Sequence, residues 1–295
     1  MFKSVEKIET MIEAMPYIRK FQGKTIVVKY GGHAMVNEKL KKSFAQDVVL
    51  MQFFGLRPVI IHGGGPEITE MLNKIGKKSQ FVEGVRITDE ETAEIAQMIL
   101  VGKISSEITS LISLSGGKAL GLSGKDSNLI KAQRLFKKVK VNGKLKKVDV
   151  GLVGDILSIN TDLIEDVLES GYMPVISPIG LGAKGETYNI NADTVAGKIA
   201  GAMKAQKLVM MTDVDGIYEN PKDPKTFISF LTFAKASKMA AAGKIEGGMI
   251  PKVNACIDAL EAGTKSAHII NGKIPHSLLL EIFTDKGLGT MVAKK

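Results

Sequence analysis

The stretch Lys24-Thr25-Ile26-Val27-Val28-Lys29-Tyr30-Gly31-Gly32 decides the fold class, because it joins a β-branched apolar run directly to glycines. A second stretch, Pro58-Val59-Ile60-Ile61-His62-Gly63-Gly64-Gly65-Pro66, repeats the pattern, and residues 37–54 between them carry apolar side chains at helical spacing. Further strands are predicted at residues 173–177, 208–211 and 267–270. Uninterrupted apolar strands alternating with helices predict an α/β fold whose largely parallel sheet is covered on both faces.

Local signals predict several helix boundaries. Pro66 occupies a favoured first-turn position of a helix, and Thr88 followed by Glu91 predicts a capping box before the next helix. Residues 4–15 predict a separate amphipathic helix that belongs to no strand–helix unit. Pro16 is expected to end or kink that helix.

The composition excludes several classes of protein. Of the 295 residues, 44% are hydrophobic, which is enough for a sizeable core and excludes a disordered chain. The one cysteine, Cys256, cannot form an internal disulfide. The longest run without a charged residue, 170–183, is shorter than the ~20 residues of a membrane-spanning helix, so no membrane partner is expected. Glu6 and Glu9 argue against a secretory signal, and we therefore expect a cytoplasmic protein.

The net charge of +9, from 40 basic and 31 acidic residues, raises the question of nucleic-acid binding. The excess is concentrated in residues 118–147, where Asp126 is the only acid and Phe136 the only aromatic residue. A base-stacking surface has almost nothing to use there, so no nucleic-acid partner is expected. Asn142-Gly143 is the signal of a two-residue turn, and residues 135–150 are interpreted as an exposed lysine-rich hairpin.

Four patterns imitate ligand-binding motifs and fail in context. Residues 180–185 match G-x-G-x-x-G but are not followed by an apolar helix. Gly23-Lys24-Thr25 resembles the end of a phosphate-binding loop yet precedes a strand, and Asp213 with Asp215 lacks the other ligands of a calcium loop. The four histidines show no metal-ligand spacing, so no direct metal site is predicted.

Two glycine clusters at the carboxyl ends of two strands carry the strongest chemical signal, since open parallel sheets bind ligands at that edge. Lys29 beside Gly31 and Gly32 combines a cation with bare backbone N–H groups, which suits a phosphate. The glycines at 63–65 allow the backbone to approach a ligand closely. Each cluster also has a structural alternative. Lys29 can be a strand-end lysine that extends into solvent, and the glycines at 63–65 can form only a tight turn.

Other candidate residues also have structural alternatives. Arg86 can be a plain surface arginine, and Asp193 can be the N-cap of the helix that follows it. Gly197 and Gly201, one turn apart in that helix, indicate close backbone packing, for example on the sheet. Residues 212–218 predict a third strand end with a loop that can receive a nucleotide.

Taken together, these residues resemble the amino-acid kinase superfamily, and within it most closely the branch that phosphorylates N-acetyl-L-glutamate. The resemblance covers the chain from about Lys24 to its end, and it implies a three-layer αβα sandwich with a mainly parallel central sheet. The motifs that carry it, in the family's order, are Val28-Lys29-Tyr30-Gly31-Gly32, Ile61-His62-Gly63-Gly64-Gly65-Pro66, Gly84-Val85-Arg86-Ile87-Thr88, Gly121-Leu122-Ser123-Gly124-Lys125-Asp126, Asn189-Ile190-Asn191-Ala192-Asp193, Thr212-Asp213-Val214 and Gly248-Met249-Ile250-Pro251-Lys252.

The resemblance also implies an organisation into an N-terminal helix and two lobes. The helix takes residues 1–20, residues 21–182 form the lobe for the acyl acceptor, and residues 183–295 form the lobe for ATP. The Pro/Gly-rich stretch 178–186 is the predicted seam between the lobes.

Roles for single residues follow from the same resemblance. Lys29 and Lys252 are expected to stabilise the transferring phosphoryl group, and Asp193 is expected to hold both lysines in place. Arg86 is expected to face a substrate carboxylate. The expected substrate-binding residues are Gly64, Gly65, Arg86, Asn189 and Asn191. The expected ATP-binding residues are Gly31, Gly32, Thr212, Asp213, Val214, Gly216, Ile217 and Met249. The stretch Ile245-Glu246-Gly247 is a departure whose nucleotide contacts stay open.

The implied reaction is ATP-dependent phosphorylation of the γ-carboxylate of N-acetyl-L-glutamate in arginine biosynthesis, with Mg²⁺ supplied as Mg-ATP. A carboxylate with a pKa of about 4.3 is already an anionic nucleophile at neutral pH, so no general base is required. The alternatives are a kinase of glutamate, aspartate, carbamate or uridylate, or a catalytically silent small-molecule sensor on the same fold.

Feedback inhibition by L-arginine in a homo-oligomer, a ring-like hexamer built from dimers, is the last implication. It rests on the N-terminal helix, which links dimers in arginine-sensitive members, although the helix can instead fold back on its own lobe. The residues expected at the arginine site are Tyr17, His268, Glu281, Gly287 and Gly289. Glu281 is expected to face the cationic end of arginine, with exposed glycine backbone at its α-groups.

Overall fold

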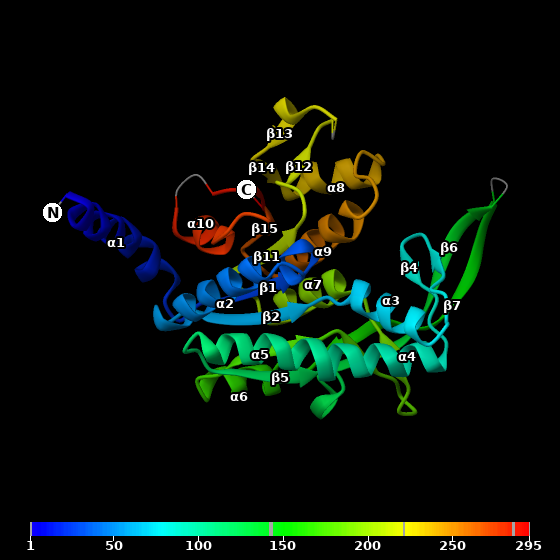
Figure 1. Cartoon of the computed structure of the whole chain (residues 1–295). Coiled ribbons are helices and arrows are strands. Elements are labelled where there is room, and N and C mark those ends of the chain that lie inside the picture. The colour runs from blue at the N-terminus through cyan, green and yellow to red at the C-terminus, as the bar shows by residue number, and fades with distance from the viewer. Residues whose placement is uncertain (1, 142–143, 221, 285–286, 295) are drawn as a thin grey trace.

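An eight-stranded sheet in the order β14-β16-β15-β11-β1-β2-β8-β5 runs through the centre of the molecule (Figure 1). All neighbouring strands are parallel except β15 and β16. The computed structural model describes residues 2–141, 144–220, 222–284 and 287–294. The strands of the sheet are β1 (Thr25–Tyr30), β2 (Arg57–His62), β5 (Ala119–Ser123), β8 (Met173–Ser177), β11 (Lys207–Thr212), β14 (Phe230–Thr232), β15 (Ser266–Asn271) and β16 (Thr290–Ala293). The five predicted strands and the mainly parallel sheet are confirmed.

Helices cover both faces of this sheet, which makes the predicted three-layer αβα sandwich. Alternation along β1 divides the core, because Val27 belongs to one hydrophobic cluster whereas Ile26 and Val28 belong to the other. The helices of the Val27 cluster are α6 (Asp162–Glu169), α7 (Ala192–Ala202), α8 (Phe233–Ala241) and α9 (Met249–Ala262). The helices of the other cluster are α1 (Phe2–Phe21), α2 (Glu38–Phe53), α3 (Gly65–Lys74), α4 (Glu90–Gln97), the π-helical segment Met98–Ile104, α5 (Ser105–Leu114) and α10 (Ser277–Phe283).

The two hydrophobic cores divide by sheet face and not by the predicted lobes. Each core combines residues from both sides of the boundary at residue 182: Val59 with Leu208 on one face, and Ile60 with Val209 on the other. Because β1 pairs directly with β11, the sheet crosses that boundary without a break. The assignment of one ligand to each lobe stays a prediction.

A closed barrel of four short or bent strands accompanies the sheet and carries a long arm (Figure 1). Its strands are β6 (Ile130–Val141), β7 (Lys144–Ile159), β9 (Ile179–Leu181) and β10 (Thr187–Asn189). β6 and β7 form an antiparallel hairpin in which Val141 pairs with Lys144, which confirms the predicted hairpin. Its turn residues 142 and 143 lie outside the described residues.

The remaining elements are short. Two two-stranded sheets are present, β3 (Phe81–Val82) with β4 (Val85–Arg86), and β12 (Ile217–Tyr218) with β13 (Phe227–Ile228). The 3₁₀ turns are η1 (Gly32–Met35), η3 (Asp126–Asn128) and η4 (Pro224–Thr226).

Two predicted helix boundaries are wrong. The N-cap of α4 is Asp89, whose carboxylate accepts from Thr92 N at 2.9 Å, and not Thr88. Thr88 is buried, and its hydroxyl donates to the Arg86 carbonyl oxygen instead. The helix α1 neither ends nor breaks at Pro16 but continues to Phe21, whose buried ring packs this end of the helix into the core. Tertiary packing thus outweighs the local cost of a proline in a helix.

One continuous helix, Glu90–Leu114, is long and apolar enough to cross a membrane by length and composition, which the search for uncharged runs missed. Its side chains Ile95, Leu100, Ile104 and Ile112 are buried in the core, and 44% of its most apolar part is buried in this fold. That burial is typical of a core helix, and no other helix among the described residues meets the same criterion.

Gly197 and Gly201 do mark close backbone packing, but against α9 and not against the sheet. A Cβ on Gly197 would lie 2.7 Å from the Ala255 carbonyl oxygen, and one on Gly201 would lie 2.6 Å from the Ala262 Cβ. The two glycines therefore let α7 and α9 approach closely, which positions the first turns of both helices.

Candidate active site

Two lysines and one aspartate from three different elements meet at the carboxyl edge of the sheet. Lys29 lies near the end of β1, Asp193 in the first turn of α7, and Lys252 in the first turn of α9. Asp193 Oδ1 lies 3.2 Å from Lys29 Nζ, and Asp193 Oδ2 lies 2.8 Å from Lys252 Nζ. We call these three residues the carboxyl-edge cluster; the structure brings together all three predicted catalytic residues.

The carboxyl-edge cluster is buried and has a surplus of positive charge. The side chains of Lys29, Asp193 and Lys252 are 10%, 6% and 14% exposed. Burial lowers the pKa of Lys29 below 10.5, although Asp193 opposes this shift. Burial also disfavours ionised Asp193, but the two ammonium groups outweigh it and hold the Asp193 pKa below its ordinary value. Because one carboxylate cannot neutralise two ammonium ions, the cluster favours a further anion.

Asn191 aims Asp193 into this cluster. Asn191 is the N-cap of α7, and its Oδ1 accepts from Asp193 N at 2.8 Å and from Thr194 N at 3.2 Å. The alternative that Asp193 is itself the N-cap is therefore wrong, because its carboxylate is one residue further into the helix and faces the lysines. Asn191 also has its side-chain oxygen committed to the helix, so a substrate contact by it stays a prediction.

The loop after β1 places glycine backbone directly over Lys29. A Cβ on Gly31 would collide with Lys29 Nζ, and Gly32 has a φ of +71°, which glycine adopts without strain. Asp213, from the loop after β11, accepts a hydrogen bond from His33 N at 2.7 Å. A Cβ on Gly32 would strike this carboxylate. A side chain at position 31 would thus displace the Lys29 ammonium, the backbone conformation favours glycine at position 32, and Asp213 ties the loop to the adjacent strand.

The second glycine cluster lies beside the first, as predicted. β1 and β2 are adjacent and parallel with Tyr30 paired to His62, and Gly63 N donates to the Tyr30 carbonyl oxygen at 2.9 Å. A Cβ on Gly64 would lie 2.6 Å from Leu100 Cδ2, so the π-helical segment packs directly against this glycine. π-helical turns often occur at functional sites, and the π-helical segment Met98–Ile104 here packs against the glycine loop.

Arg86 is buried and not a plain surface arginine. Its guanidinium donates to the Gly65 carbonyl oxygen at 2.9 Å, to Thr69 Oγ1 at 2.8 Å and to Ser79 Oγ, and it lies 4.8 Å from the Phe81 ring centroid. Burial lowers the pKa of Arg86, and no carboxylate is paired with it in the described part of the chain. A guanidinium held without a counterion beside Gly65 suits a ligand carboxylate. The two hydroxyl partners were not predicted, since no sequence spacing identifies them.

The predicted nucleotide-binding residues are divided by the structure into open and buried positions. Thr212 ends β11 and is buried, whereas Asp213 just beyond it is partly exposed and Val214 is exposed. Gly216 and Ile217 are buried: Ile217 N donates to Thr290 Oγ1 at 2.8 Å, and a Cβ on Gly216 would strike the same hydroxyl. These two positions are therefore committed to packing against β16, and a nucleotide contact by them stays a prediction.

Two further predicted residues lie next to the cluster in sequence. Met249 opens α9 one turn before Lys252, and it is partly buried against the Val27 core. Asn189 ends β10, two residues before the cap of α7. Both lie where a ligand contact is feasible, and neither contact is tested by the structure.

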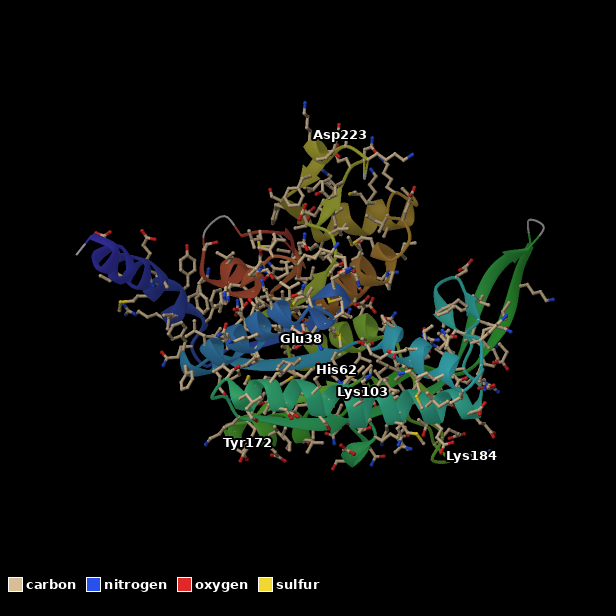
Figure 2. All side chains as sticks on the ribbon, viewed as in Figure 1. Glu38, His62, Lys103, Tyr172, Lys184 and Asp223 are labelled. Atoms are coloured by element: carbon tan, nitrogen blue, oxygen red, sulfur yellow. The ribbon has the colours of Figure 1, made fainter. Side chains whose placement is uncertain are left out.

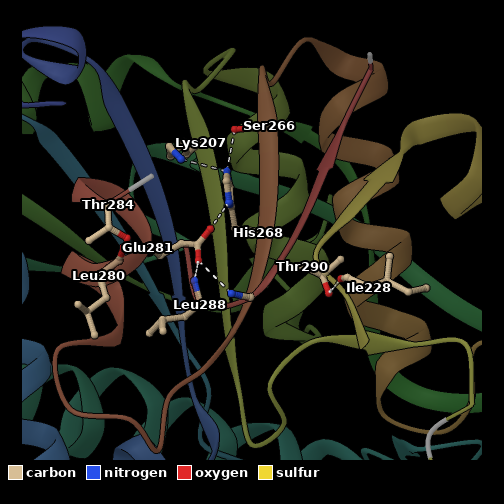
Figure 3. Close-up of polar contacts among 10 residues, drawn as sticks. Lys207, Ile228, Ser266, His268, Leu280, Glu281, Thr284, Leu288 and Thr290 are labelled. Atoms are coloured by element: carbon tan, nitrogen blue, oxygen red, sulfur yellow. Dashed lines mark hydrogen bonds and ion pairs between the residues drawn. The ribbon is translucent and has the colours of Figure 1, made fainter. Parts of the chain in front are cut away.

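The amino edge of the same sheet holds a second charge cluster (Figure 3). His268 Nδ1, on β15, lies 2.5 Å from Glu281 Oε1, on α10. The other carboxylate oxygen accepts from Leu288 N at 2.7 Å and from Gly289 N at 3.1 Å. Gly287 has a φ of +56°, and a Cβ there would lie 2.9 Å from Glu281 Oε2. The structure thus brings together four of the predicted arginine-site residues.

The expected state of that site needs a correction. Glu281 is buried and its oxygens are already bound, and Gly289 is buried with its N–H donating to Glu281. The Gly289 N–H is therefore occupied by the carboxylate and is not an exposed group, whereas a ligand contact by the partly exposed Gly287 stays a prediction. Tyr17 lies on α1, which packs against α10.

Lys207 and Ser266 also belong to this second cluster and were not predicted. His268 Nε2 lies 3.2 Å from Lys207 Nζ and 2.9 Å from Ser266 Oγ. Burial lowers the pKa of Lys207 to about 8, and its ammonium lies 5.2 Å from the Phe21 ring centroid. The available signal was a lysine at the start of an otherwise apolar strand. We call Lys207, Ser266, His268 and Glu281 the amino-edge cluster.

A cavity of about 790 Å³ lies away from both clusters, along α4 and the start of β10. Its lining includes Glu90, Glu94, Gln97, Leu152 and Thr187, and none of the predicted site residues. The described residues contain no group of three or more His, Cys, Asp or Glu side chains placed to hold a metal ion.

Comparison with known proteins identifies close relatives of the whole chain. The model of the amino acid kinase family matches residues 24–271. An acetylglutamate kinase from Methanocaldococcus jannaschii is 54% identical over 295 residues, which cover 100% of this chain and 98% of that protein. An acetylglutamate kinase from Moorella thermoacetica is 56% identical over 288 residues, covering 98% of this chain and 97% of the relative.

Solved structures show the same fold. N-acetylglutamate synthase from Neisseria gonorrhoeae, in complex with coenzyme A and N-acetyl-glutamate, superposes with a TM-score of 0.83 at 28% identity, over 98% of this chain and 63% of that one. The same synthase in complex with coenzyme A and L-arginine gives a TM-score of 0.78 at 26% identity, over 98% of this chain and 65% of that one. Carbamate kinase from Giardia lamblia bound to AMP-PNP shares the fold with a TM-score of 0.67 at 16% identity, over 92% of this chain and 99% of that one.

Proposed function

The chain belongs to the amino acid kinase family, and from that premise we propose that it transfers the γ-phosphoryl group of ATP to the γ-carboxylate of N-acetyl-L-glutamate. The products are N-acetyl-L-glutamyl 5-phosphate and ADP. This is the reaction of acetylglutamate kinases in arginine biosynthesis, and relatives of that name match this chain at 54% and 56% identity over nearly their full lengths.

The observation that carries the chemical part of the proposal is the Asp193 carboxylate between two ammonium groups. Asp193 holds Lys29 and Lys252 at the carboxyl edge, 3.2 Å and 2.8 Å from its oxygens, without neutralising both. A phosphoryl group in flight carries diffuse negative charge on its oxygens, so two fixed cations stabilise it more than the ground state. Because the ammonium groups are already held in place, little reorganisation is needed at the moment of transfer.

The acceptor needs positioning and no base. A carboxylate is anionic at neutral pH, and its oxygen forms the new bond to phosphorus while the bond from phosphorus to the leaving ADP oxygen breaks. Backbone N–H groups of the two glycine clusters are proposed to hold the phosphoryl oxygens. Magnesium enters as part of the Mg-ATP substrate, where it neutralises phosphate charge, and no group of this chain is assigned to hold it.

Arg86 is proposed to bind the carboxylate of the substrate that does not react. Its guanidinium is oriented by Gly65, Thr69 and Ser79 and has no counterion in the described part of the chain. A substrate with a second carboxylate supplies that counterion, which favours an amino acid derivative over carbamate. The same guanidinium thereby links substrate binding to the glycine loop at residues 63–65.

The proposal is tested by ADP release from ATP with N-acetylglutamate, glutamate, aspartate, carbamate or UMP as the acceptor. We expect turnover with N-acetylglutamate and at most weak turnover with the others. If only a non-acetylated acid, carbamate or UMP is phosphorylated, the substrate assignment is wrong. If no acceptor supports turnover, the chain is better explained as a ligand sensor on the same fold.

Regulation is a finer proposal. We propose that the chain is a cytoplasmic homo-oligomer, a hexamer built from dimers, and that L-arginine inhibits it at the amino-edge cluster. Support comes from α1, which extends from the body of the molecule (Figure 1), and from the arginine complex of the related synthase. A carboxylate has about four lone-pair positions, and Glu281 already uses three of them for His268, Leu288 N and Gly289 N. A bidentate guanidinium therefore requires the His268 contact to open.

Deletion of residues 1–20 tests this proposal. We expect a dimer that retains activity and no longer responds to arginine. Sedimentation of the full-length chain should give a hexamer whose activity falls with added arginine. A full-length chain that sediments as a dimer, or that ignores arginine, contradicts the regulatory proposal and leaves the kinase assignment untouched.

A further inference from the structure

His62 lies at the end of β2, deep in the molecule and directly before the second glycine cluster (Figure 2). Its Nδ1 lies 2.9 Å from the Gly63 carbonyl oxygen, and its Nε2 lies 3.0 Å from Ser177 Oγ at the end of β8. Ser177 Oγ also lies 3.2 Å from the Leu100 carbonyl oxygen of the π-helical segment. The imidazole thus connects the glycine loop to two neighbouring elements.

The contacts decide which ring nitrogen carries the proton. A carbonyl oxygen can only accept, so the Nδ1 that faces Gly63 O must be the donor. Full burial lowers the pKa of His62 to about 4, so the ring is neutral near pH 7 and its Nε2 accepts from the Ser177 hydroxyl. The single proton of the Ser177 hydroxyl then goes to Nε2 and not to the Leu100 carbonyl oxygen 3.2 Å away, and that carbonyl still accepts from Ser105 N within the helix.

The hydrogen bond from His62 to the Gly63 carbonyl oxygen also fixes the direction of the Gly64 N–H. The peptide bond is planar and trans, so the carbonyl of Gly63 and the N–H of Gly64 point in opposite directions from one rigid plane. The other side of Gly63 is fixed as well, because its N–H donates to the Tyr30 carbonyl oxygen at 2.9 Å. Gly64 is buried, and among the described residues its N–H donates to no acceptor of the protein. An unpaired buried N–H is costly, so a ligand acceptor at this loop would satisfy it.

We propose that His62 is a positioning residue for phosphoryl transfer: its Nδ1–H holds the Gly63 carbonyl and thereby aims the Gly64 N–H at the reacting group. The inference rests on the proposed function, since it assumes that the glycine loop binds the transferring phosphoryl group or the acceptor carboxylate. Ser177 acts one step further back, because its hydroxyl supplies the hydrogen bond to the bare Nε2 of the ring that the Gly63 carbonyl has selected. Without the imidazole, the peptide plane between Gly63 and Gly64 is free to rotate, and the Gly64 N–H no longer has a fixed direction.

Asparagine and glutamine variants separate positioning from packing. In His62→Asn the amide nitrogen takes the place of Nδ1, whereas in His62→Gln it takes the place of Nε2. His62→Leu fills the space without a hydrogen bond. We expect His62→Asn to keep kcat within about threefold of the wild type, because it keeps one neutral hydrogen bond to Gly63 O. His62→Gln and His62→Leu should lower kcat by about 10- to 100-fold with little change in either KM, since a misplaced donor costs rate more than binding.

His276→Asn is the matched control, because that histidine is half exposed and pairs with Asp47 at 2.6 Å, away from the glycine loop. It should leave kcat unchanged. Ser177→Ala keeps the imidazole and its Nδ1–H donor and removes only the hydrogen bond to Nε2, so we expect a loss of kcat of about threefold. Thermal unfolding of every variant identifies those that lose activity because they lose the fold.

¹⁵N NMR of the histidine side chains provides a readout that does not depend on activity. The His62 ring should show a protonated Nδ1 and a bare Nε2 between pH 6 and 8. An Nε2-protonated ring overturns the inference, as do equal kcat values for His62→Asn and His62→Gln. If the wild-type chain phosphorylates none of the acceptors, the proposed function fails instead, and the tautomer assignment is still decided by the NMR result.

Discussion

The two ends of one parallel sheet hold two buried charge clusters with opposite character. Lys29 lies near the carboxyl end of β1 and pairs in register with Met210 of β11, whereas Lys207 begins β11 and pairs with the start of β1 next to it. At the carboxyl edge, two ammonium groups share the single carboxylate of Asp193. At the amino edge, the carboxylate of Glu281 is satisfied by His268 and by backbone N–H groups (Figure 3).

The difference lies in what each cluster leaves unpaired. Within the carboxyl-edge cluster one carboxylate faces two ammonium groups and leaves a surplus of positive charge, and glycine backbone lies beside it. In the amino-edge cluster three of the about four acceptor positions of Glu281 are occupied, so a bidentate ligand must first displace an internal partner. Burial and charge alone therefore do not identify a catalytic site; an unbalanced charge next to open backbone does.

Asp193→Asn should have the largest effect, because it leaves two buried ammonium groups without their shared anion. We expect a loss of about 3–5 kcal/mol in the free energy of unfolding. Asp193 also raises the Lys29 pKa against the effect of burial, so its removal should move the alkaline limb of kcat to lower pH. Asp258→Asn is the control, since its partner Lys198 is 44% exposed, and it should change stability by less than about 1 kcal/mol. Denaturant titration and a pH–rate profile measure both effects.

Lys252→Ala should come next, with kcat reduced by about 10²–10³-fold and KM nearly unchanged. The ammonium is most useful once the transferring phosphoryl group carries its diffuse charge, so it acts on the transition state more than on the bound substrates. Steady-state kinetics with N-acetylglutamate and ATP measure the change, and Lys198→Ala in α7 serves as the lysine control. A pure KM effect would contradict the assigned role.

Arg86→Ala should raise the KM for the acid by about 10–100-fold while the affinity for ATP stays the same, because its guanidinium binds the substrate in both states. Arg57→Ala removes a partly exposed arginine that pairs with Glu165 and should leave KM unchanged. The role assignment fails if the kinetic profiles of the Lys252 and Arg86 variants are exchanged.

Lys207→Met should have the smallest effect on the protein, and it should raise the free energy of unfolding instead of lowering it. The pKa of Lys207 is lowered from 10.5 to about 8, so its charged form is disfavoured in the fold. The unfolded chain therefore binds more protons between these values, and the native state of the wild type gains stability as pH rises from 8 to 10.5. Allowing for the lost contact with His268, we expect the variant to be more stable at pH 7 by about 2 kcal/mol.

The gain from Lys207→Met should shrink toward pH 10.5, where the wild-type lysine is neutral in both states. Calorimetry at several pH values measures this trend. Turnover without arginine should stay within about twofold of the wild type, since the substitution lies at the opposite end of the sheet. A loss of turnover like that of Lys252→Ala would show that the two clusters are not separate.

Much of this architecture is determined by the sequence alone. The apolar runs ending in glycine at Gly31 and Gly63 predict parallel strands and a ligand-binding edge, because periodicity and glycine act over a few residues. Asn142-Gly143 predicts the hairpin for the same reason. Lys29, Asp193 and Lys252 were found through the order of their motifs, although they are far apart in the chain.

Contacts between distant segments were decided only by the tertiary structure. Asn191 caps α7 in place of Asp193, the cap that the sequence suggested, and the Asp193 carboxylate faces the lysines instead. Arg86 finds its hydroxyl partners, and His62 finds Ser177, across segments whose separation no spacing rule describes. Where a side chain's charge or proton depends on such a neighbour, local sequence carries no signal, because burial and hydrogen bonding are fixed only when the sheet and its two helical layers have assembled.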